Sequence, residues 1–153
     1  MPLNTLKGFL DENRIPYVSI KHSTAYTAQA IAASAHIKGK NLAKTVIIKL
    51  DGVMAMAVLP AKYKVDLEQL KKAAKSKKAG LAGEQEFVEK FPDCEAGAMP
   101  PFGNLYDMKV FVDKTLSDDE EIAFNACSHS ELIQLKYKDF ERLEKPVLAH
   151  FHA

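Results

Sequence analysis

The chain has 153 residues, of which 47% are hydrophobic and 27% are charged, and its formal net charge is +1. This length suits a single domain spanning residues 1–153, and the balanced mixture of apolar and charged residues excludes a disordered tail. The near-zero charge argues against a protein that grips nucleic acid through bulk charge, although it is compatible with a local basic face.

Apolar periodicity and turn residues predict regular structure along most of the chain. In order, we predict a helix at 3–10, a strand at 15–20, a helix at 28–35, strands at 45–50 and 53–59, helices at 67–74 and 84–90, strands at 109–113, 122–125 and 132–136, and a short helix near 140–143. Thr27 and Asp66 are placed to cap helices, Asp51-Gly52 signals a hairpin, and Pro60 is expected to stop the strand before it. This succession predicts a mixed α/β fold, with helices around a mixed sheet.

Residues 92–104 differ from the rest, because they hold three prolines and two glycines and can form neither a helix nor a central strand. A long ordered loop in a compact domain often carries function. Gly97 permits close approach of a ligand, and Pro100 and Pro101 stiffen the second half of the loop, so nearby backbone N–H groups can point at one carbonyl or oxyanion. A stiff connector that covers the core is an equally good interpretation.

Two sets of lysines are candidate ligand contacts. Lys44 stands at the mouth of an apolar strand, where a sheet presents ligand groups, although a solvated strand-end lysine is the more common explanation. Seven lysines lie between residues 62 and 78, opposed only by Asp66 and Glu68. A solvated helix face is the usual reason for such a run, and phosphate contact through Lys71, Lys72 and Lys75 is the sharper alternative.

Signatures of several other sites are absent from the sequence. It contains no dinucleotide-binding, P-loop or GxSxG motif. Of the five histidines only His150 and His152 lie close together, at a terminus expected to fray, so no metal site is predicted. Cys94 and Cys127 form no CxxC pair, and a single disulfide is possible. Cys127 and His129 would share a face only on an extended backbone, which makes a cysteine nucleophile a minor alternative.

Nothing in the sequence predicts export or membrane insertion. The N-terminus lacks a basic region followed by an apolar run, and the longest apolar stretch, Val53 to Leu59, is far shorter than the ~20 residues of a membrane span. We therefore expect a cytoplasmic protein without membrane contact.

A set of short motifs occurs in an order that is specific for one family. The motifs are Ala-Tyr-Thr-Ala-Gln at 25–29, Ala-Lys-Thr-Val-Ile at 43–47, Val-Leu-Pro-Ala at 58–61, Val-Asp-Leu at 65–67, Phe-Pro-Asp-Cys-Glu at 91–95, Gly-Ala-Met-Pro-Pro-Phe-Gly at 97–103, Val-Asp at 112–113, Phe-Asn-Ala at 124–126 and Ser-His at 128–129. With this set the chain resembles the YbaK/EbsC family, which includes free-standing relatives of the editing domain of bacterial prolyl-tRNA synthetase. The resemblance covers about residues 15–146 and implies that domain's fold, a mixed, mostly antiparallel sheet surrounded by helices.

The resemblance implies aminoacyl-tRNA deacylation, in which the ester joining a wrong amino acid to the terminal adenosine of a tRNA is hydrolysed. It assigns catalytic roles to three residues: Lys44 holds the phosphate or sugar of the terminal nucleotide, the backbone at Gly97 positions the ester carbonyl, and His129 bounds the amino-acid pocket. A ribose hydroxyl assists water attack, so no cofactor or metal is expected. The implied substrate-binding residues are Tyr26, Thr27, Ala98, Met99, Pro100 and Ser128.

The implied substrate is a small amino acid such as Ala or Cys on a proline tRNA, since a synthetase pocket discriminates poorly against a smaller residue. The expected partner is the 3′ acceptor end of aminoacyl-tRNA, with an aminoacyl-tRNA synthetase as a second candidate, and the protein is expected to be a monomer or weak dimer. Relatives commonly have Gly where this chain has Cys127, which bears on the shape of the pocket. The alternative function is a non-catalytic tRNA- or synthetase-binding module of the same fold.

Overall fold

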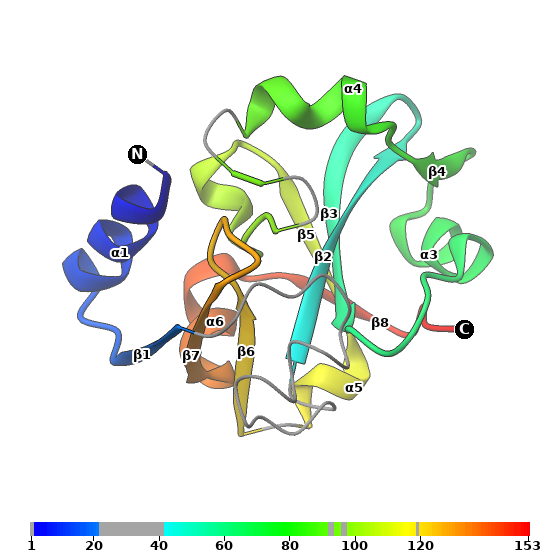
Figure 1. Cartoon of the computed structure of the whole chain (residues 1–153). Helices are drawn as coiled ribbons and strands as arrows, with labels where there is room; N and C mark the ends of the chain where they lie inside the picture. Colours follow the sequence, from blue (N-terminus) through cyan, green and yellow to red (C-terminus); the bar gives the residue numbers. More distant parts are fainter. Residues whose placement is uncertain (1, 22–41, 92–93, 96–97, 119) are drawn as a thin grey trace.

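The computed structural model describes residues 2–21, 42–91, 94–95, 98–118 and 120–153 (Figure 1). The helices are α1 (Pro2–Glu12), α3 (Leu67–Ala74), α4 (Glu84–Phe87), α5 (Lys114–Ser117) and α6 (Tyr137–Glu144), with 3-10 turns η2 (Val88–Lys90) and η3 (Gly103–Leu105). The strands are β1 (Tyr17–Lys21), β2 (Leu42–Leu50), β3 (Val53–Pro60), β4 (Ala79–Leu81), β5 (Lys109–Asp113), β6 (Glu121–Asn125), β7 (Glu131–Lys136) and β8 (Val147–Ala149).

These strands form one sheet in the order β1-β7-β6-β2-β3-β5-β8, and β4 pairs with the far end of β2. The pairs β1–β7, β6–β7, β2–β3 and β2–β4 are antiparallel. The pairs β2–β6, β3–β5 and β5–β8 are parallel. The sheet is therefore mixed and mostly antiparallel, which confirms the expected fold class.

The two faces of the sheet bury different helices. On β2, Ala43 and Ile47 point into a large core that also contains Leu6 and Leu10 of α1 and Phe140 of α6. Ile48, one residue along, points to the other face, where Leu70 of α3 and Phe151 pack. Alternate residues of a strand face opposite ways, so these apolar positions fix the face of each remaining side chain on β2. No helix in the described part of the chain is long and apolar enough to cross a membrane.

Local signals in the sequence act as expected at two places. Asp51 and Gly52 have positive φ angles of 51° and 85°, as the tight turn between β2 and β3 requires. The Asp66 side chain accepts hydrogen bonds from the backbone N–H groups of Glu68 and Gln69, which makes it the N-cap of α3.

The structure also corrects parts of the sequence-based prediction. Strand β3 does not stop before Pro60. This proline pairs with Ala43 and is the last residue of the strand. The sequence pattern missed β4, β8 and α5, which have only three or four residues each. The C-terminus is not frayed, because Phe151 is fully buried and His152 bridges to Val65. The predicted helix at 28–35 and its cap Thr27 lie outside the described residues.

A buried carboxyl links the loop after residue 102 to helix α6. Glu144 Oε1 accepts a hydrogen bond from the backbone N–H of Asn104 at 3.1 Å. Burial raises the pKa of Glu144 from 4.5 to about 7, although the hydrogen bonds from Asn104 and Gly103 oppose the shift. The folded protein therefore holds this proton more tightly than the unfolded chain does.

We expect Glu144 to make stability fall as the pH rises. Its raised pKa gives a contribution that is complete below about pH 4.5 and is lost as the pH passes about 7. The free energy of unfolding should drop by up to about 3 kcal/mol over this window. Urea unfolding between pH 5 and pH 8 measures the drop, and Glu144→Gln, which stays neutral, should flatten it. An equal pH dependence in both proteins would contradict the assignment.

Candidate functional site

The site begins where β2 joins β6. Leu42 pairs with Ala123 and Ala43 with Phe124, in parallel. Lys44 and Asn125 each lie one residue beyond this last pair, so they would face each other if the register continued past it. Strand alternation places both side chains on the face shared by Leu42 and Ala123, which pack together. The extended register therefore predicts a cationic side chain and a primary amide close together at this end of the pairing.

Lys44 is half-buried, and its surroundings favour an anionic ligand. Burial, followed by repulsion from Lys64, lowers the pKa of Lys44 from its usual 10.5. An anion bound against this ammonium group would offset both effects. Asn125 Oδ1, near the end of the same pairing, is buried and has no hydrogen-bond partner among the residues that the structure describes. An unsatisfied buried oxygen of this kind is costly unless a ligand or water serves it.

Hydrogen bonds join two loops that lie far apart in the sequence. The backbone N–H of Glu95 donates to Cys127 O at 3.0 Å, and the N–H of Cys127 donates to Ala98 O at 2.9 Å. The Glu95 carboxylate also accepts a hydrogen bond from the backbone N–H of His129 at 2.7 Å. The Gly97 loop and the Ser128-His129 loop, which carry two of the family motifs, therefore form one structural unit.

A disulfide between Cys94 and Cys127 adds a covalent link to the same unit. Cys127 has a φ of 66°, in the left-handed region that favours glycine. Glycine would adopt this backbone conformation at lower cost than cysteine does. With its sulfur bonded to Cys94, Cys127 offers no thiolate for nucleophilic attack in this structure.

Residues 127–130 form a turn, so the condition for a Cys127–His129 pair, an extended backbone, is not met. The Ser128 hydroxyl accepts a hydrogen bond from the backbone N–H of Ser130 at 3.1 Å and lies 2.8 Å from the Ser130 hydroxyl. Ser128 therefore stabilises the turn. His129 is only 8% exposed and is held through its backbone by Glu95.

The other residues expected from the sequence fall into three groups. Tyr26, Thr27 and Gly97 lie outside the described residues. The side chains of Ala98, Met99 and Pro100 are buried. The basic residues Lys71, Lys72 and Lys75 lie on the last turn of α3 and its C-cap, where positive charge also complements the helix dipole.

Sequence reasoning missed two contributors to the site. Glu95 belongs to a family motif, yet its role is visible only in the fold, where its carboxylate holds the His129 backbone across 34 residues of sequence. Asn125 is likewise only one letter of a motif, and its alignment with Lys44, one residue past the last pair, would follow from a parallel pairing that no local pattern reveals. The sequence signal that could have indicated Asn125 is a polar residue at the end of an apolar strand.

Comparison with known proteins assigns the family. Residues 22–143 match the family model described as the aminoacyl-tRNA editing domain. The chain belongs to this family. It is 29% identical over 154 aligned residues to the Multifunctional Ser/Thr-tRNA deacylase ProXp-y of Escherichia coli strain K12, and the alignment covers 95% of this chain and 90% of that protein.

Solved structures show the same fold. The chain superposes with a TM-score of 0.84 on a protein described as a candidate trans-editing enzyme for prolyl-tRNA synthetase, covering 99% of this chain and 97% of that one at 17% identity. The hypothetical protein APE2540 matches with a TM-score of 0.86, covering 97% of this chain and 99% of that one, also at 17% identity. Identities this low show the shared fold alone, which is that of the editing-domain relatives.

We expect the Cys94–Cys127 disulfide to stabilise the joined loops. Cys127→Ser should lower the free energy of unfolding of the oxidised protein by roughly 2–4 kcal/mol, because the link joins residues 33 apart and restricts the unfolded chain. Urea unfolding with and without a phosphine reductant measures this. Reduction should weaken the wild type and leave Cys127→Ser unchanged, and a wild type indifferent to reductant would contradict the role.

Proposed function

We propose that this chain, acting as a single domain, is a free-standing aminoacyl-tRNA deacylase. It would hydrolyse the ester between a small amino acid and the terminal adenosine of a mischarged tRNA. The observation that carries the proposal is the half-buried Lys44 at the end of the β2–β6 pairing, in a chain of the editing-domain family. A half-buried lysine and an unsatisfied amide oxygen at the end of one strand pairing suit a ligand with both a phosphate and hydrogen-bond donors.

The proposed reaction is attack of water on the ester carbonyl. The water oxygen bonds to the carbonyl carbon, the bond from that carbon to the ribose oxygen breaks, and the proton lost by water ends on the departing ribose oxygen. The neighbouring ribose hydroxyl orients the water, so the protein needs no general base. Its task is to hold the ester in place and stabilise charge on the carbonyl oxygen, which can supply a large part of a rate enhancement.

Each part of the site has a proposed role. Lys44 binds the phosphate or sugar of the terminal nucleotide. The backbone at Gly97 receives the carbonyl oxygen, and His129 bounds the pocket for the amino acid. The hydrogen bonds of Glu95 and the Cys94–Cys127 link support this arrangement, because they fix the two loops against each other.

The proposed amino acid is small. The sequence resemblance favours Ala or Cys on a proline tRNA, and the name of the Escherichia coli relative adds Ser and Thr. Cys127 occupies a turn position at which glycine has no side chain, so its Cβ and sulfur occupy space beside the pocket loops. This position is where we expect the choice of amino acid to differ from that of relatives with glycine.

The deciding experiment is a deacylation panel with tRNAs charged with Ala, Cys, Ser, Thr and Pro. We expect the wild type to release at least one of the small amino acids. Lys44→Ala should slow that reaction roughly 10- to 100-fold, the loss of one charge-assisted contact. Release of labelled amino acid under single-turnover conditions measures the rate.

Lys49→Ala is the matched control for this variant. Lys49 lies on the same strand, and its amine pairs with Glu86 at 2.9 Å on an exposed surface, so its loss should leave the rate unchanged. A folded wild type that hydrolyses none of the five substrates would show that the enzyme proposal is wrong. If that protein still binds tRNA, the non-catalytic binding module of the same fold takes its place.

We further propose that Lys71, Lys72 and Lys75 contact tRNA phosphates. Lys72 and Lys75 are exposed, and Lys71 lies 3.4 Å from Glu68. Replacing all three with Gln should weaken binding of uncharged tRNA and reduce the slope of log affinity against log salt by about 2–3. The matched control replaces Lys136, Lys138 and Lys145, of which Lys145 caps α6 as Lys75 caps α3. Equal effects of both triples would mean that only net charge matters.

A further inference from the structure

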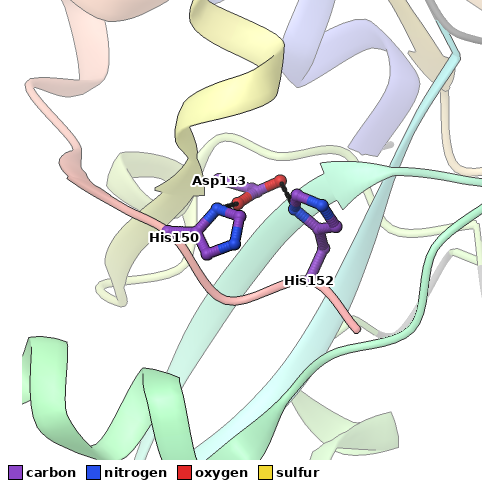
Figure 2. A group of neighbouring side chains, drawn as sticks. All are labelled: Asp113, His150 and His152. Atoms are coloured by element: carbon purple, nitrogen blue, oxygen red, sulfur yellow. Dashed lines mark hydrogen bonds and ion pairs between the residues drawn. The ribbon is translucent and has the colours of Figure 1, made fainter.

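A group of side chains outside the proposed deacylation site gathers where β5 meets the C-terminal segment (Figure 2). Strand β8 runs parallel to β5 and pairs Ala149 with Asp113. After Ala149 the C-terminal segment passes Asp113. The rings of His150 and His152, which are two positions apart, both point toward the Asp113 carboxylate. The ligand atoms of Asp113, His150 and His152 all lie within 4.8 Å of one another.

Asp113 is fully buried and firmly oriented. Its Oδ1 accepts a hydrogen bond from the backbone N–H of Phe151 at 3.2 Å, and its Oδ2 accepts one from the Thr115 hydroxyl. Carboxylates that bind metal ions are themselves held by such outer contacts. A carboxylate has about four lone-pair positions, so these two bonds leave acceptor capacity on each oxygen.

Each histidine directs its Nδ1 atom toward a different oxygen of the Asp113 carboxylate. His152 Nδ1 lies 2.7 Å from Asp113 Oδ2, and His150 Nδ1 lies 4.0 Å from Asp113 Oδ1. His152 is also fixed by stacking on Tyr63, with ring centroids 4.3 Å apart. Two ligand atoms on a tetrahedral zinc ion lie roughly 3.4 Å apart, given bonds of about 2.0–2.2 Å. The observed separations bracket this value, and small ring movements in opposite directions would reach it.

We propose that Asp113, His150 and His152 bind a divalent transition-metal ion, with zinc as the best chemical fit. Two imidazoles and one carboxylate form a ligand set that suits zinc, whereas calcium and magnesium prefer sets made of oxygen atoms alone. The ion would lie between His152 Nδ1 and Asp113 Oδ2, in place of their direct contact. His150, which is 58% exposed, can move to complete the third bond, and water fills the remaining position.

The ion would fasten the C-terminal segment to the sheet. That segment already contacts the loop before α3, since the Ala153 N–H donates to Lys64 O at 2.8 Å and the Asp66 N–H donates to Phe151 O. Register across β3 puts Asp113 and Lys44 on the same face, two strands or ~10 Å apart. The metal site would therefore neighbour the deacylation site without sharing a residue with it, and the metal proposal does not depend on the enzyme function.

The test adds zinc to the full chain after treatment with a chelator. Calorimetry measures zinc binding, and thermal unfolding measures the change in Tm. We expect about one zinc ion per chain and a rise in Tm of roughly 5–10 °C at a free zinc concentration of 100 times Kd. Magnesium and calcium should produce no such rise. A wild type that neither binds zinc nor gains stability from it would overturn the proposal.

His150→Ala is the variant that decides the location. Its side chain is exposed, so the metal-free Tm should stay at the wild-type value, while zinc affinity should fall more than about 10-fold. The same pair is measured in the Cys94→Ser/Cys127→Ser background, because free thiols also bind zinc. Wild-type zinc affinity in His150→Ala, in either background, would place the ion elsewhere and overturn the proposal.

Discussion

The parallel pairing of β2 with β6 is the constraint on which the rest of the structure depends. Among the described residues, the pairing consists of Leu42 with Ala123 and Ala43 with Phe124, and it joins the β1-β7-β6 part of the sheet to the β2-β3-β5-β8 part. Both faces of this pairing are buried. Leu42 and Ala123 pack with Leu132 on one face, and Ala43 and Phe124 pack into the large core on the other. Burial of apolar side chains thus stabilises this short pairing. The register of the pairing determines how the residues beyond it, Lys44 on β2 and Asn125 on β6, are aligned.

The second organising feature is the attachment of the Gly97 loop to the turn after β6. Backbone hydrogen bonds, a carboxylate and a disulfide all act between Cys94–Ala98 and Cys127–His129. A glycine at position 127 would adopt the same left-handed turn at lower conformational cost, but could not make the covalent link. This chain therefore accepts a less favourable backbone conformation and gains a cross-link between its two motif loops.

Sequence patterns anticipated the elements whose signals are local. The hairpin at Asp51, the cap at Asp66 and the apolar strand at 45–50 depend on neighbours in sequence, and each was predicted. The three-residue strands β4 and β8 are too short to show a period. Contacts such as Glu95 with His129, or Asp113 with His152, join residues 34 and 39 positions apart. They arise from strand order, which one sequence read alone does not supply.

The course of the last residues bears on how the protein is prepared. Phe151 is buried, and the Ala153 N–H is hydrogen-bonded to Lys64 O, so the carboxyl end emerges against packed structure (Figure 1). A polyhistidine tag appended there would place a run of imidazoles beside His150 and His152, where they would compete for any metal. The same tag would also add histidines near Lys44 and Lys64 during tRNA binding. A tag before α1, at the other end of the chain, avoids both.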